Sequence, residues 1–219
     1  MKYKMLSLLS QFNKGDVITI GVIFSCLLLY AVFPTNNIFQ QIISSVTFLF
    51  VIPVLYVKII LKRSLKEFGI QKGEWKTGLI WIMISLAVAF LILYIFSHYF
   101  GFFDKYSVPR FIRRNFFLFI GYEIFLTGFF VALYEIFFRG FVMFFFRTKI
   151  GYWSVIVQGV AFFLLFWLSS SINWPIAPYL IFVLLGGLVA FYSRSIIYSF
   201  ASNLLFIIVV DSVFIKLIK

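Results

Sequence analysis

Tyr134-Glu135-Ile136-Phe137-Phe138-Arg139-Gly140 places two opposite charges inside an apolar run of about residues 116–146. A charge in the interior of a bilayer is costly, so ionisable residues within a membrane span are candidates for function. Glu135 and Arg139 stand at positions i and i+4, which share one face of a helix and allow an ion pair. The stretch therefore predicts a membrane helix that contains a buried pair of charges.

The whole chain has the composition of a polytopic membrane protein. Its 219 residues are 63% hydrophobic and 12% charged, and the mean hydropathy is +1.09, whereas soluble domains carry about 25% charged residues. We expect an all-α, polytopic transmembrane helical bundle of about seven spans, within a range of six to eight, that forms one integral membrane domain over residues 1–219. The spans are predicted from apolar runs at about 17–34, 38–61, 77–100, 116–146, 154–171, 177–193 and 196–215.

The net charge of +12 does not indicate nucleic-acid binding, because most Lys and Arg residues lie between the apolar runs. In such positions they set the topology and contact anionic headgroups. With the N-terminus in the cytoplasm, twelve Lys and Arg residues fall inside and six outside, although Arg110, Arg113 and Arg114 are discordant. We predict a multi-pass protein of the cell membrane with a cytoplasmic N-terminus. We expect the first run to be an uncleaved span, because no small-residue cleavage site follows it.

The fourth apolar run is too long for one simple span, so we expect it to tilt, bend or extend beyond the bilayer. Gly121, Gly128 and Gly140 are possible bending points. The stretch from Tyr122 to Gly128 resembles the stretch from Tyr134 to Gly140, but an offset of twelve residues rotates the second copy by about 120°. Glu123 and Glu135 therefore need not face the same site. In the sixth run, Gly186-Gly187 predicts close contact between helices.

Several further polar residues fall within the apolar runs. Glu123 has no cation near it in the sequence, so we expect a protonated, hydrogen-bonded acid. A polar seam with Glu123 is predicted for Tyr134, Gln158, Ser169, Ser170, Ser199 and Asn203. Asp211 lies close to Lys216 and Lys219, which predicts an interfacial carboxylate.

The single histidine, His98, follows Ser97 at the end of the third run, so we expect it to face solvent or lipid headgroups. No pattern of Cys or carboxylate residues flanks it, so we predict no metal site. The sequence gives no indication of a cofactor.

Glu-x-x-x-Arg-Gly in a membrane helix, followed by two more polar-bearing helices, resembles the CPBP family. This family includes type II CAAX prenyl proteases, proteins similar to lysostaphin resistance protein A, and bacteriocin-processing or self-immunity proteins. The resemblance covers about residues 60–210, where Leu65–Ile70 and Gly151–Ser154 also look like family segments. It implies peptide hydrolysis within the membrane, in which a Glu and a His activate water while a His and an Asn stabilise the oxyanion.

The family pattern is Glu-Glu-x-x-x-Arg, then Phe-x-x-x-His, then His-x-x-x-Asn. The second Glu and the Arg match Glu135 and Arg139, but Tyr134 stands at the first Glu, which is the family's base. A Tyr with a pKa of about 10 is a poor base at neutral pH. The position of the second-motif His is taken by Trp167 in one alignment and by Ser170 in another.

The third motif has two possible registers. One puts Asn203 at the His and Ile207 at the Asn, and the other puts Ser199 at the His and Asn203 at the Asn. The resemblance thus implies Glu135, Arg139 and Asn203 as catalytic positions. It predicts that Glu135, Asn203 and either Trp167 or Ser170 surround one pocket in the membrane.

Three functions follow from these patterns. The first is a non-catalytic family member that binds hydrophobic or lipidated peptides or a membrane protein partner. The second is an active CAAX-type endopeptidase that uses Glu135 with Asn203 and a bound water. The third is an unrelated small transporter, since transporters often have interrupted helices and charges near the middle of the membrane.

Overall fold

The computed structural model describes residues 13–34, 36–113, 115–169 and 173–218, and every regular element within these ranges is helical. Six helices are long and apolar enough to cross a membrane: Lys14–Val32, Ile38–Ile60, Trp75–Phe100, Phe116–Ile150, Trp174–Ser193 and Ile196–Leu217. A shorter apolar helix, Trp153–Leu168, corresponds to the fifth predicted run. The prediction of an all-α polytopic helical bundle is confirmed, and the number of candidate spans lies within the predicted range.

The first two spans form a helical hairpin. Its first arm is α2 (Lys14–Val32), and its second arm joins α3 (Ile38–Val46), η1 (Thr47–Val51), α4 (Ile52–Leu55) and η2 (Tyr56–Ile60). The short helix η3 (Leu65–Phe68) leads into α5 (Trp75–Phe100). The next connection contains α6 (Phe102–Lys105) and η4 (Arg110–Arg113).

The second half of the chain begins with one long helix. This helix joins α7 (Phe116–Gly121), η5 (Tyr122–Thr127), α8 (Gly128–Tyr134), η6 (Glu135–Met143) and α9 (Phe144–Ile150). It is followed by α10 (Trp153–Leu168), η7 (Trp174–Ile176), α11 (Ala177–Ser193) and α12 (Ile196–Ile218).

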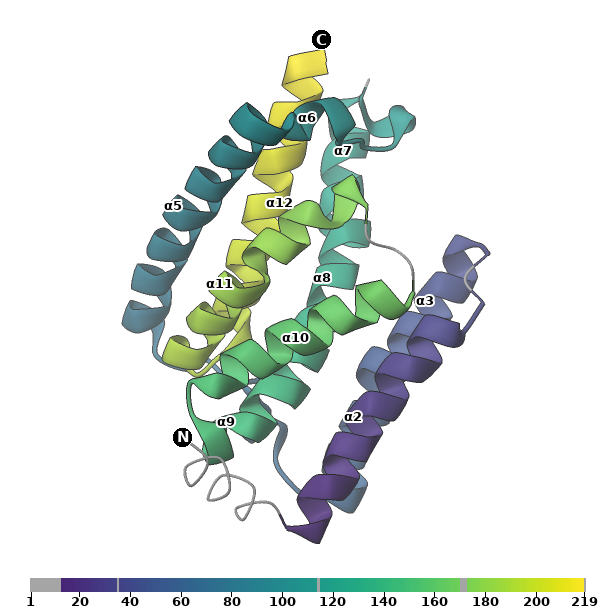
Figure 1. The fold of residues 1–219 in the computed structure, drawn as a ribbon, viewed down its shortest axis with the longest axis vertical. Helices are drawn as coiled ribbons and strands as arrows, with labels where there is room; N and C mark the ends of the chain where they lie inside the picture. The colour runs from purple at the N-terminus through teal and green to yellow at the C-terminus, as the bar shows by residue number, and fades with distance from the viewer. Residues whose placement is uncertain (1–12, 35, 114, 170–172, 219) are drawn as a thin grey trace.

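The long helix and α10 lie between two groups of helices (Figure 1). On one side is the hairpin, where α2 packs on α10 and η1 packs on η6. On the other side are α5, α11 and α12, which pack on one another, while α12 also contacts η5, α8 and η6. Because the long helix contacts both groups, its polar residues are enclosed by protein, where a charge can find a partner.

The long helix departs from regular α-helical geometry in two places. Segments η5 and η6 are π-helical, and each contains the glutamate of one copy of the Tyr-Glu-Ile-Phe repeat. The expected bending points lie beside or within them, with Gly121 directly before η5, Gly128 directly after it and Gly140 inside η6. π-helical turns are rare and often occur at functional sites, so the two glutamates stand in the least regular parts of this helix.

One end of the bundle is closed by its connections. The Glu74 amide donates to the Ser193 carbonyl at 2.8 Å, and the Ile196 amide donates to the Gly69 carbonyl at 3.0 Å. Gly73 has a φ of +58°, and a Cβ there would lie 2.2 Å from the Ser193 carbonyl oxygen, so only glycine fits. Lys149 pairs with Asp16 at 2.6 Å at this same end. The basic segments 58–76, 147–149 and 194 are therefore gathered at one end of the molecule.

Candidate functional site

Glu135 and Arg139 form a buried ion pair, as predicted from their spacing. Arg139 Nη1 lies 3.0 Å from Glu135 Oε1, and each side chain is only 1% exposed. The contact is electrostatic rather than an aligned hydrogen bond, because Nη1 has no hydrogen-bond partner among the described residues. Two charges removed from solvent in this way stabilise a fold only while both are present.

Helix α12 holds the other side of the Glu135 carboxylate. Ser199 Oγ donates to Glu135 Oε2 at 2.6 Å, and Asn203 Nδ2 donates to Glu135 Oε1 at 3.1 Å. Ser199 and Asn203 lie one helical turn apart, so both face η6. Each carboxylate oxygen thus has a neutral donor, and the Arg139 guanidinium supplies the opposite charge.

Helix α11 completes the surroundings of Arg139. Arg139 Nη2 donates to the carbonyl of Val183 at 3.1 Å and lies 3.4 Å from that of Phe182. Gln158 Nε2 on α10 donates to the same Val183 carbonyl at 2.9 Å. The predicted close contact at Gly186 is present, because a Cβ there would lie 2.8 Å from Arg139 Nη2. The charged pair therefore links the long helix to both α11 and α12.

Some polar atoms in and beside this cluster have no hydrogen-bond partner among the described residues. They are Arg139 Nε and Nη1, Asn203 Oδ1 and Gln158 Oε1. Unpaired buried polar atoms reduce stability. The contacts that offset this cost are the Glu135–Arg139 ion pair and the hydrogen bonds with Ser199, Asn203 and Val183.

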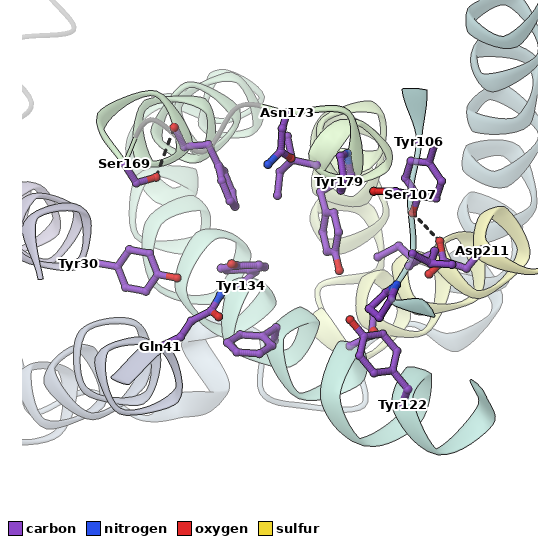
Figure 2. A pocket seen from close by; sticks show the side chains of 18 of the residues that line it. Tyr30, Gln41, Tyr106, Ser107, Tyr122, Tyr134, Ser169, Asn173, Tyr179 and Asp211 are labelled. Atoms are coloured by element: carbon purple, nitrogen blue, oxygen red, sulfur yellow. Dashed lines mark hydrogen bonds between the residues drawn. The ribbon is translucent and has the colours of Figure 1, made fainter. Parts of the chain in front are cut away.

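A separate cavity of about 350 Å³ lies nearer the opposite end of the bundle (Figure 2). Its polar wall is dominated by five tyrosines, Tyr30, Tyr106, Tyr122, Tyr134 and Tyr179. Further polar groups come from Gln41, Thr127, Ser169, Asn173 and Asp211. The volume falls in the range of small-molecule sites, about 300–1,000 Å³. The cavity therefore has room for a small ligand.

Asp211 is the acidic residue in the cavity wall. It is only 5% exposed, and Tyr106 Oη donates to its Oδ1 at 2.5 Å. Burial, followed by the nearby Asp211 carboxylate, raises the pKa of Tyr106, so this hydroxyl stays protonated and acts as the donor. Asp211 was expected as an interfacial carboxylate beside Lys216 and Lys219. Instead, the fold encloses it against the connection before the long helix.

Glu123 lies behind the cavity wall, next to Asp211 and Thr127. Its side chain is 0% exposed, and no salt bridge among the described residues includes it. The Glu123 carboxyl interacts with the side chains of Asp211 and Thr127, in agreement with the expectation of a hydrogen-bonded acid. The long helix thus meets α12 through two glutamates. Glu123 lies beside Asp211, and Glu135 lies beside Asn203.

The remaining predicted site residues lie in different surroundings. Tyr134 and Ser169 line the cavity, as does Ile207. Ser199 and Asn203 belong to the Glu135 cluster, and Gln158 lies beside it on the Val183 carbonyl. Trp167 is 62% exposed and joins neither group, while Ser170 lies outside the described residues. The predicted seam is therefore divided between the charged cluster and the cavity. The prediction that Glu135, Asn203 and Trp167 surround one pocket is wrong for this cavity, because none of the three lines it.

Several cavity residues were not predicted from the sequence. Tyr30 lies on α2, Tyr106 in the connection after α6, and Tyr179 on α11. Tyrosines are common near the ends of membrane spans, so none stood out. His98 is exposed at the end of α5 and stacks on Tyr94, in agreement with the expected position. The signal that could have found the cavity is Asp211, a carboxylate within an apolar run.

Comparisons with protein-family models, with curated proteins and with solved structures find no match. The fold and the distribution of apolar residues define the chain as a multi-pass integral membrane protein of the all-α class. Its apolar outer surface fits contact with a lipid bilayer. The site adds a buried charged cluster and a tyrosine-rich cavity to this description.

Proposed function

We propose that the chain is a non-catalytic relative of the CPBP intramembrane proteases, and that it binds a hydrophobic or lipidated peptide or a membrane protein partner. Proteins of this kind act by binding or regulation, as in bacteriocin self-immunity. The proposal combines the motif resemblance with the arrangement of the residues at the motif positions. Arg139 on the long helix and Asn203 on α12 both contact Glu135, and this meeting of three motif positions supports the proposal.

The observation that carries the proposal is the contrast between Glu135 and Tyr134. Both oxygens of Glu135 are occupied by Arg139, Ser199 and Asn203, and Glu135 does not line the cavity. Tyr134, at the position of the family's base, does line the cavity. A general base must reach the water that it activates. A phenol in the cavity and a carboxylate held outside it favour binding over hydrolysis.

We also propose that the protein lies in the cell membrane with its N-terminus in the cytoplasm. This orientation is supported by the basic segments, which lie together at one end of the bundle. That end contains the Lys149–Asp16 ion pair and the hydrogen bond from the Glu74 amide to the Ser193 carbonyl. The cavity would then lie towards the non-cytoplasmic side. Peptides or partners would reach it from that side or from the bilayer.

Photo-crosslinking tests the binding of a peptide. Phe166 lines the cavity, whereas Phe163 on the same helix is 51% exposed on the outer surface. Benzoylphenylalanine at position 166 should crosslink to an N-acetylated farnesylated peptide in proteoliposomes, and the same probe at position 163 should give at least fivefold less product. Mass spectrometry should show an uncleaved peptide in the adduct and in the supernatant.

Two outcomes would overturn the proposal. Cleavage of the peptide by the wild-type chain, lost in a Glu135→Gln variant, would favour the active endopeptidase. Equal crosslinking at positions 166 and 163 would show that the peptide partitions into lipid without entering the cavity.

A further inference from the structure

The cavity has an acidic character that is unexpected in a chain of net charge +12. Among the described residues of its wall, Asp211 is the ionisable acid and there is no Lys, Arg or His. Glu123 adds a second carboxyl group directly behind Asp211. The positive charge of the protein is therefore kept away from this space.

Two cations of the connection before the long helix, Lys105 and Arg113, are engaged elsewhere. Arg113 donates through Nε and Nη2 to the Val108 carbonyl, and its guanidinium lies over the Phe214 ring. Lys105 lies 4.8 Å from the centre of the Trp174 ring. None of the salt bridges among the described residues includes Asp211 or Glu123. A buried carboxylate without a cation is unfavourable, so a ligand of positive charge would be stabilised here.

The other residues of the cavity wall indicate which kind of cation would bind. Figure 2 shows Tyr30, Tyr134 and Tyr179 directed towards the interior of the cavity. Tyrosine hydroxyls accept hydrogen bonds, and their rings attract cations. Phe130, Phe166 and Ile207 provide apolar surface in the same cavity. A bare metal ion would gain nothing from that surface, whereas an organic cation would bury its hydrocarbon part against it.

The buried Glu123 carboxyl adds to the acidic character of this end of the bundle. It is fully buried, and it interacts with the side chains of Asp211 and Thr127 rather than with a cation. Its position next to Asp211 and Thr127 puts it beside two residues of the cavity wall. A second carboxyl at this place increases the negative potential that a cation in the cavity would experience.

We propose that this cavity binds a protonated primary amine that carries an apolar group, with Asp211 as the counter-ion. The ammonium group donates hydrogen bonds to Asp211 and to tyrosine hydroxyls, and the apolar group packs on Phe130 and Phe166. A free small molecule can carry this ammonium group, and so can the lysine side chain or the N-terminus of a peptide. The inference rests on the proposed function only in that both place a ligand in the same cavity.

Calorimetric titration of the full chain in lipid nanodiscs at pH 7 tests the proposal. We expect saturable binding of 2-phenylethylammonium and at least tenfold weaker binding of 2-phenylethanol and of 3-phenylpropanoate, which have similar shapes without the positive charge. Asp211→Asn should weaken amine binding at least tenfold. Glu67→Gln, which removes an exposed acid that pairs with Arg63, should change it less than twofold.

Equal binding of the amine and the alcohol would overturn the proposal, as would unchanged amine binding in a folded Asp211→Asn variant. The comparison of the three ligands uses only the wild-type chain, so it decides the matter even if the variant does not fold. The crosslinking experiment uses an acetylated peptide without a free amine. Peptide crosslinking at position 166 without amine binding would therefore reject the amine site and leave the proposed peptide binding standing. Amine binding without peptide crosslinking would reject the proposed peptide binding and leave the amine site standing.

Discussion

Replacement of Arg139 by Met should destabilise the protein by about 3–5 kcal/mol, because it leaves the Glu135 carboxylate buried without its counter-charge. Ser199 and Asn203 would still donate to Glu135, but neither supplies a positive charge. The loss should appear as a lower midpoint of reversible unfolding in mixed micelles of increasing SDS content.

The matched control for this variant is Arg63→Met. Arg63 and Glu67 are also an i,i+4 pair, with 3.6 Å between the charged atoms, but both side chains are about half exposed. Exposed pairs contribute little to stability, so this variant should unfold close to the wild type. Equal midpoints for Arg139→Met and Arg63→Met would show that the buried pair has no structural role.

Substitution of Gly186 by Leu should also have a large effect, since the site has no room for a side chain. A Cβ at this position would lie 2.8 Å from Arg139 Nη2 and 3.2 Å from the Phe182 ring. Arg139 cannot move aside without losing its bonds to α11 and its contact with Glu135. Overpacking of this kind costs about 1–3 kcal/mol or more, and the disturbed ion pair adds to that cost.

Gly121→Leu is the control for the crowded site. It also replaces a helical glycine, but a Cβ at Gly121 meets no atom within 4 Å. We expect the SDS midpoint of this variant to stay near that of the wild type. A Gly186→Leu variant as stable as Gly121→Leu would mean that α11 can move away from the long helix at little cost.

The helices and the buried pair could be predicted from the sequence because their signals are local. Apolar runs of spanning length require helices in a bilayer, and the spacing of Glu135 and Arg139 places them on one face. The Gly186-Gly187 pair likewise predicted a close helix contact, which the structure contains. These features depend on residues that are neighbours in the chain.

The cavity could not be predicted, because it depends on residues that are distant in the chain. Tyr106 comes from a connection and reaches Asp211 on α12, which is 105 residues away. Two lysines near Asp211 in the sequence favoured an interfacial position, but the tertiary packing decided its burial. The polar residues do not form a single seam for the same reason. They lie on different helices, and the rotation of each helix about its axis decides which neighbour each side chain meets.

On this account, Glu135 holds helices together as half of a buried ion pair. A double-mutant cycle that combines Glu135→Gln with Arg139→Met tests it most directly. We expect each single variant to be destabilised and the double variant to be more stable than the sum of the two losses predicts, with a coupling of about 1–3 kcal/mol. Losses that add to within about 0.5 kcal/mol, or a Glu135→Gln variant as stable as the wild type, would contradict the claim.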